Sequence, residues 1–128
     1  MKKLTSIASV VIAATLTVAL SACAGGPKSY DSIEDLRNDV EAAGIICDNW
    51  FDLDATPPAT ASASCNSSTT IVIYSPGSDV ATEAQETVSW YNENEMHYGI
   101  VYGPNWLVNV GEEAPTVAAV LHGESLVG

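Results

Sequence analysis

The stretch Thr70-Ile71-Val72-Ile73-Tyr74 decides the fold class of this 128-residue chain. It consists of β-branched and aromatic residues, which favour strands, and it therefore predicts a buried strand. Ser75-Pro76-Gly77 ends the strand, and the next segment has the spacing of a helix that Ser78 can cap. The apolar residues of that segment recur at intervals of four, four and three: Val80, Ala84, Val88 and Tyr91. A strand followed directly by a helix predicts a fold that mixes both.

The residues before this strand predict a first helix and a paired strand. Asp31-Ser32-Ile33-Glu34 resembles a capping box with Asp31 as the N-cap, and Gly44 is a suitable helix end. Ile45-Ile46-Cys47 indicates the start of a buried strand. Residues 55–70 are rich in Ala, Ser, Thr and Pro, and they form either a loop or the entry to a hairpin that turns near Asn66-Ser67-Ser68.

The C-terminal part predicts a second hairpin and a last helix. Residues 98–102 and 106–110 flank Gly103-Pro104-Asn105, a sequence typical of turns, and the helix covers residues 115–123. The order helix, strands, helix, strands, helix predicts a single α+β domain over residues 31–128. We expect one small antiparallel sheet with helices packed on one face, and one disulfide.

The N-terminus has the layout of a secretory signal peptide. Lys2 and Lys3 precede an uncharged, mainly apolar run of 17 residues that ends at Leu20. Leu20-Ser21-Ala22-Cys23 then resembles the lipobox of bacterial lipoproteins. That resemblance implies cleavage before Cys23 and a diacylglycerol on its thiol, whose two acyl chains give stable membrane attachment. Residues 1–22 are then the signal peptide, and residues 23–30 are a flexible tether.

Two other interpretations of the N-terminus compete with this one. The run could be an uncleaved signal anchor, although a spanning helix needs roughly 20 apolar residues and this run contains several Thr and Ser residues. Alternatively, Cys23 could be a structural cysteine after an ordinary signal peptide. The order of a large aliphatic residue, two small residues and a cysteine favours the lipoprotein.

From about Tyr30 onward the chain resembles small secreted lipoproteins of the actinobacterial type, from high-GC Gram-positive bacteria. The matching pieces are residues 32–36 leading to Ala43-Gly44 and Cys47, a second cysteine before an apolar strand, and Gly103-Pro104-Asn105-Trp106. The resemblance implies a layout and a location at the extracytoplasmic face of the cell membrane. It assigns no catalytic residue.

The charge of the chain narrows the partners that it can bind. Removal of residues 1–22 removes Lys2 and Lys3. The remaining chain has 16 acidic residues and only two basic ones, Lys28 and Arg37, so its formal charge is −14 with neutral histidines. Such a surface repels phosphate backbones and anionic lipid head groups. We therefore expect no nucleic-acid partner, and we expect a domain that stands off the bilayer and attracts cations.

Cys47 and Cys65 remain once Cys23 carries lipid. An even pair of cysteines in an oxidising compartment predicts a disulfide. Two free buried thiols are the alternative.

Two groups of residues are candidate metal sites. Asp48, Asp52 and Asp54 cluster beside aromatic residues, and oxygen ligands suit calcium, which makes a weak divalent-cation site one hypothesis. The spacing departs from a calcium loop, and ordinary solvated acids explain the same pattern. Glu93, Glu95 and His97 alternate and would share one face of an extended segment, but an acidic strand edge explains them equally well.

No set of residues in the sequence predicts catalysis, and we expect neither enzyme activity nor a cofactor. Gly123-Glu124-Ser125 lacks the second glycine of a nucleophile elbow. Trp106 could bind a partner or close the core. Trp90 and Tyr91 are adjacent on a helix and cannot share one face, so one of them is expected to be exposed.

The sequence thus predicts a membrane-anchored extracytoplasmic lipoprotein whose acidic domain binds an unknown ligand without catalysis. The alternatives are a weak calcium-type binding domain and a purely structural component of the envelope.

Overall fold

The computed structural model describes residues 26–128, so the predicted signal peptide and Cys23 lie outside the described residues. Within residues 26–128, no helix is long and apolar enough to cross a bilayer. The elements in chain order are α2 (Ile33–Ala42), β1 (Phe51–Leu53), β2 (Ala59–Asn66), β3 (Thr69–Tyr74), α3 (Val80–Glu93), β4 (Gly99–Tyr102), β5 (Trp106–Asn109), the 3₁₀ helix η1 (Gly111–Glu113), α4 (Ala114–Leu121) and β6 (Glu124–Val127).

One antiparallel sheet carries the fold, with its strands in the order β1-β2-β3-β5-β4-β6. Both predicted hairpins are present, because β2 pairs with β3 and β4 pairs with β5. β3 and β5 also pair and join the two hairpins into one sheet. The α+β class, the antiparallel sheet and the Cys47–Cys65 disulfide are therefore confirmed.

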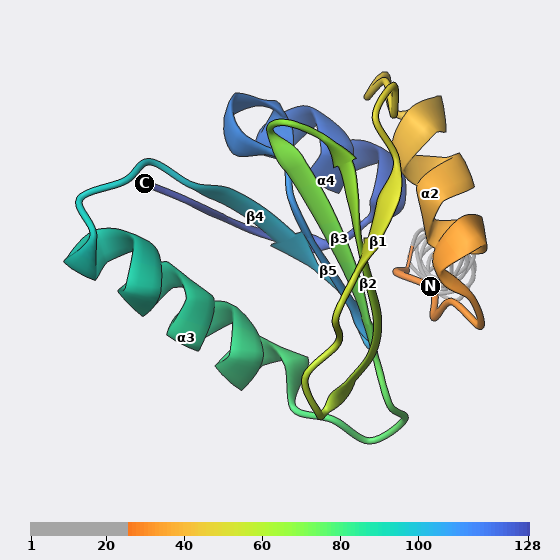
Figure 1. Cartoon of the computed structure of the whole chain (residues 1–128), viewed down its shortest axis with the longest axis horizontal. Helices are drawn as coiled ribbons and strands as arrows, with labels where there is room; N and C mark the ends of the chain where they lie inside the picture. The colour runs from red at the N-terminus through yellow and green to blue at the C-terminus, as the bar shows by residue number, and fades with distance from the viewer. Residues whose placement is uncertain (1–25) are drawn as a thin grey trace, which may run out of the picture.

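The helices lie on both faces of the sheet, not on one face as the sequence analysis expected (Figure 1). α2 and α4 pack on the face formed by Ile71, Ile73, Val101 and Val108, together with Trp106. α3 packs on the other face, against Ile100 and Leu107. Strands β3, β4 and β5 carry apolar side chains on both faces, and burial of both therefore requires helices on both.

Several element boundaries differ from the expected ones. The N-cap of α2 is Ser32, whose hydroxyl accepts from the Asp35 amide at 3.2 Å, and that of α3 is Asp79. Each cap lies one residue beyond the one predicted from the sequence. Residues 45–47 form a loop and not a strand, and strand β6 was not expected.

The last residues of the predicted tether, from Lys28 to Tyr30, are already part of the domain. Tyr30 is buried, and its ring makes an edge contact with Trp106 at a centroid distance of 5.9 Å. Asn105 accepts from the Tyr30 amide at 3.0 Å and donates to the Tyr30 carbonyl at 2.7 Å. The Trp106 indole N–H donates to the Lys28 carbonyl at 2.8 Å. The chain is therefore fixed to the β4–β5 turn from Lys28 onward.

Candidate functional site

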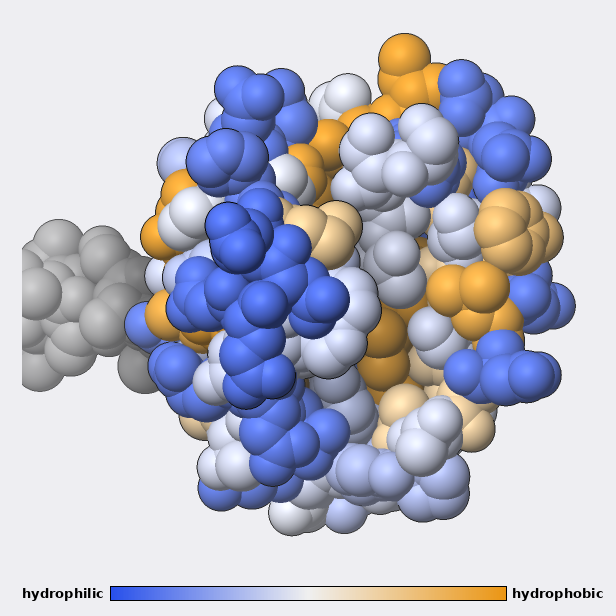
Figure 2. Space-filling model, turned by 60° about the vertical axis from the view of Figure 1, so that its left-hand side comes forward, coloured by the Kyte–Doolittle hydropathy of each residue, from blue (hydrophilic) through white to orange (hydrophobic). Residues whose placement is uncertain are grey.

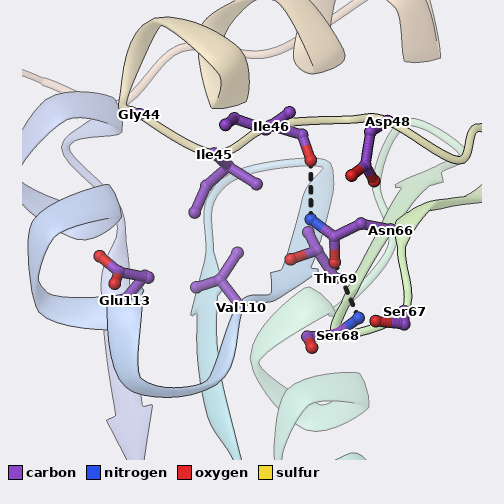
Figure 3. A pocket seen from close by; sticks show the side chains of 10 residues that line it. All are labelled: Gly44, Ile45, Ile46, Asp48, Asn66, Ser67, Ser68, Thr69, Val110 and Glu113. Carbon is purple, nitrogen blue, oxygen red and sulfur yellow. Dashed lines mark hydrogen bonds between the residues drawn. The ribbon is translucent and has the colours of Figure 1, made fainter.

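A hollow of about 410 Å³ lies at the end of the sheet where β2 turns into β3 (Figure 3). Its walls come from the loop after α2, the β2–β3 turn and the segment after β5. The lining residues are Gly44, Ile45, Ile46, Asp48, Asn66, Ser67, Ser68, Thr69, Val110 and Glu113.

Local bonds hold the loop wall of this hollow in place. The Asn66 side chain donates to the Ile46 carbonyl at 2.8 Å, and its oxygen accepts from the Ser68 amide at 2.7 Å. The Cys47–Cys65 disulfide ties the same loop to β2. Asn66 therefore shapes the β2–β3 turn and the neighbouring loop together.

A second hollow, of about 630 Å³, adjoins the first. The two share Ser68, Val110 and Glu113 in their walls. The remaining residues that line the second hollow are His97, Tyr98, Gly111, Glu112, Val127 and Gly128. We call the two hollows together the end groove.

A close approach of two backbone segments forms part of the second wall. A methyl group at Gly99 would collide with the carbonyl oxygen of Gly111, and the Val110 amide donates to the Gly99 carbonyl at 2.8 Å. Gly111 itself has a φ of +62°, which favours glycine. The absence of a side chain at Gly99 thus lets η1 pack against the start of β4.

The end groove combines exposed apolar side chains with carboxylates. Ile46 is 72% exposed and Val127 is 59% exposed, the two highest values among the large hydrophobic residues in the part of the chain that the structure describes. Asp48, Glu112 and Glu113 contribute carboxylates to the walls. Among residues 26–128, no Lys or Arg lines either hollow. The walls of the groove therefore carry both exposed apolar side chains and carboxylates.

The end groove and the fixed N-terminal segment lie at opposite ends of β3. Thr69, the first residue of β3, lines the groove. Tyr74, the last, donates its amide to the carbonyl of Asn105, the residue that binds Tyr30. At a rise of about 3.3 Å per residue, these two ends are roughly 17 Å apart.

The two basic residues of the domain lie near α2, away from the groove. Lys28 contacts Asp39 at 2.9 Å, and Arg37 lies 3.6 Å from Glu41 and 4.5 Å from the centre of the Trp50 ring. Hydrogen bonds from Tyr30 and Lys28 hold the pKa of the Asp39 carboxyl below its usual range. Burial, and then the bond to Asp39, raise the pKa of the Tyr30 hydroxyl.

The predicted metal residues are not assembled into a site. Within residues 26–128, no three His, Cys, Asp or Glu side chains converge in a way that could hold a metal ion. Asp48 lies in the end groove, whereas Asp52 belongs to the exposed edge strand β1 and Asp54 follows it. The three residues of the hypothetical calcium-type site therefore do not converge in the described part of the chain.

Trp106 closes the core, which is one of the two interpretations of the sequence. Its side chain is fully buried in the core between the sheet and helices α2 and α4. Trp90 is instead the exposed tryptophan, at 53%, while Tyr91 is partly buried and accepts a hydrogen bond from Asn109 at 2.7 Å. The expectation that one of the two adjacent aromatic residues is exposed is confirmed.

Most of the groove residues could not be identified from the sequence. Its pattern predicts a buried strand at Ile46 and indicates no role for Glu112, Glu113 and Val127. Gly111 was the available signal, because glycine is among the strongest local markers of turns and loops. Comparison of the chain with protein-family models, with curated proteins and with solved structures finds no match.

Proposed function

We propose that this protein is a lipid-anchored extracytoplasmic binding protein, which takes its ligand in the end groove without catalysis. The lipobox-like sequence at Leu20–Cys23 supports the anchor, and the Cys47–Cys65 disulfide is consistent with an oxidising compartment. The observation that carries the proposal is the position of the groove, which lies at the opposite end of β3 from the N-terminal segment.

This arrangement determines which end of the domain would face the membrane. Lys28 follows Cys23 by five residues, a span of at most about 18 Å. The end of the domain that holds Lys28 and Tyr30 would therefore lie near the bilayer, and the groove would open away from it. A groove in that position is accessible to ligands outside the cell.

The hydrophilic, acidic surface of the domain is consistent with a position in water above the membrane. Figure 2 shows that hydrophilic residues gather in a column along one side of the face it presents, with apolar residues in a recess beside them. The excess of acidic residues repels anionic lipid head groups. We therefore attribute the membrane attachment to the lipid on Cys23.

Replacing Cys23 with alanine tests the anchor. We expect the wild-type protein in the membrane fraction, with the mass of a diacylglyceryl-modified chain that starts at Cys23, because two acyl chains hold a protein stably. The Cys23→Ala chain should lack this modification, and Ser29→Ala is the matched control that should keep it. Intact-mass spectrometry of the native protein is the measurement. Native protein that retains its leader and has no lipid on Cys23 would overturn the anchor.

Photo-crosslinking in intact cells tests the binding function of the groove. A photoreactive residue at position 46 should give a discrete adduct, whereas one at position 90 should not, because the two side chains are both exposed but only Ile46 lines the groove. Val127→Ser should weaken the adduct at position 46, since Val127 lies in the adjoining wall. Equal adducts at both positions, or none at position 46, would contradict a binding role for the groove and leave a structural role in the envelope.

A further inference from the structure

We infer that the end groove receives an extended polypeptide segment that combines basic and apolar side chains. This inference rests on the proposed function, because it takes the groove as the binding surface and adds the chemistry of the ligand. It has three independent supports: the exposed apolar walls, the local charge and the free edge of β6.

The apolar walls are the first support. Ile46 and Val127 lie in the two adjoining hollows and are exposed by 72% and 59%. Exposure of large apolar side chains in a polar surround is typical of binding surfaces. Covering both of them requires a ligand that carries apolar groups and reaches across the shared residues Ser68 and Val110.

The local charge is the second support. Asp48, Glu112 and Glu113 line the groove, and no Lys or Arg of residues 26–128 lines it. Lys28 and Arg37 are paired with acids elsewhere. Uncompensated carboxylates attract cations, increase the association rate of a basic partner and disfavour an acidic one. The ligand is therefore cationic as well as apolar.

The free edge of β6 is the third support and separates a polypeptide from a small cation. Among residues 26–128, β6 is the last strand in the sheet order and pairs with β4 alone. An edge strand presents unpaired backbone groups to which an extended peptide can add, while alternate side chains of that peptide enter the neighbouring pockets. Val127 belongs to this strand and also lines the groove, so backbone and side-chain contacts can form together.

Three labelled octapeptides test the inference by fluorescence anisotropy: Lys-Lys-Val-Val repeated twice (the Lys-Val peptide), Lys-Lys-Ser-Ser repeated twice (the Lys-Ser peptide) and Glu-Glu-Val-Val repeated twice (the Glu-Val peptide). Each face of these extended peptides carries both residue types, because successive side chains point to opposite faces. Each labelled peptide is titrated with the native protein in phosphatidylcholine nanodiscs, and empty nanodiscs serve as the blank. Only the Lys-Val peptide should bind well, and its affinity should fall as salt rises, because charge attraction is screened. The Lys-Ser peptide should bind about tenfold more weakly than the Lys-Val peptide, because it loses the apolar contacts.

Matched charge variants separate local recognition from overall charge. Glu112→Gln with Glu113→Gln should weaken binding of the Lys-Val peptide about fivefold, since two partly exposed ion pairs are lost. Glu34→Gln with Glu93→Gln removes the same charge from exposed positions on α2 and α3 that line neither hollow, and should change the affinity less than about twofold. Equal weakening by both pairs would show that net charge alone attracts the peptide, which would overturn the inference.

The outcomes distinguish this inference from the proposed function. Preferred binding of the Glu-Val peptide, equal binding of the Lys-Val and Lys-Ser peptides, or binding of none of the three would overturn the ligand class. The groove as a binding surface is judged separately, by the crosslink at position 46. A crosslink without peptide binding would retain the proposed function and reject the polypeptide ligand.

Discussion

Replacement of Trp106 with alanine is expected to lower the free energy of unfolding by about 3–5 kcal/mol, the range for removal of a large aromatic side chain from a core. Trp106 is fully buried, and its ring contacts Tyr30. A methyl group at Gly123 would lie 2.7 Å from this ring, which shows how closely the surroundings fit it. The substitution would also leave the Lys28 carbonyl without its indole donor.

Urea unfolding followed by far-ultraviolet circular dichroism measures this loss, because that signal comes mainly from the backbone and not from tryptophan. Trp90→Ala is the matched control and should change the free energy of unfolding by less than about 1 kcal/mol, since Trp90 is 53% exposed. Should Trp106→Ala fail to fold, Trp106→Phe keeps an aromatic ring and should lose about 1–2 kcal/mol. Similar losses for Trp106→Ala and Trp90→Ala would show that Trp106 is not a central core residue.

Replacement of both Cys47 and Cys65 with alanine is expected to lower the free energy of unfolding by about 3 kcal/mol. The disulfide joins residues separated by 18 positions, and it restricts the unfolded chain over that loop. For a domain of this size, such a loss is a large share of a net stability of about 5–15 kcal/mol. Both residues are replaced together, so that no unpaired thiol remains from this pair.

The same urea titration measures the effect of the disulfide. Wild-type protein kept reduced by dithiothreitol provides the control, because it should reproduce the loss of the double variant without any substitution. An unchanged unfolding midpoint in both samples would contradict the stabilising role of the Cys47–Cys65 bond. A loss in the double variant alone would assign the effect to the buried Cys65 side chain.

The elements that the sequence predicted well are those with local signals. The hairpin of β4 and β5 follows from its Gly-Pro-Asn turn, and α2 and α3 follow from their apolar spacing. The placement of helices on both faces was not predicted, although the continuous apolar run from Ile71 to Tyr74 indicates it. A strand whose successive side chains are all apolar is covered on both sides.

The end groove could not be predicted because it depends on contacts between segments distant in sequence. The loop with Ile46 is bonded to Asn66, and Glu113 comes from η1. Strand β6 was not predicted because its polar start, Glu124-Ser125, lacks the alternating pattern of a strand. This segment is extended because it pairs with β4. Trp106 is the opposite case, because the sequence suggested it as a partner-binding residue and it packs in the core.

The hydrogen bonds between Asn105, Trp106 and the segment from Lys28 to Tyr30 have a mechanical consequence. A pull on the N-terminal segment is transmitted to β5, an interior strand that is bonded to a neighbour on each side. Tension therefore enters the middle of the sheet and is shared by two rows of backbone bonds. A pulling force on this segment would therefore not peel the domain apart one edge strand at a time.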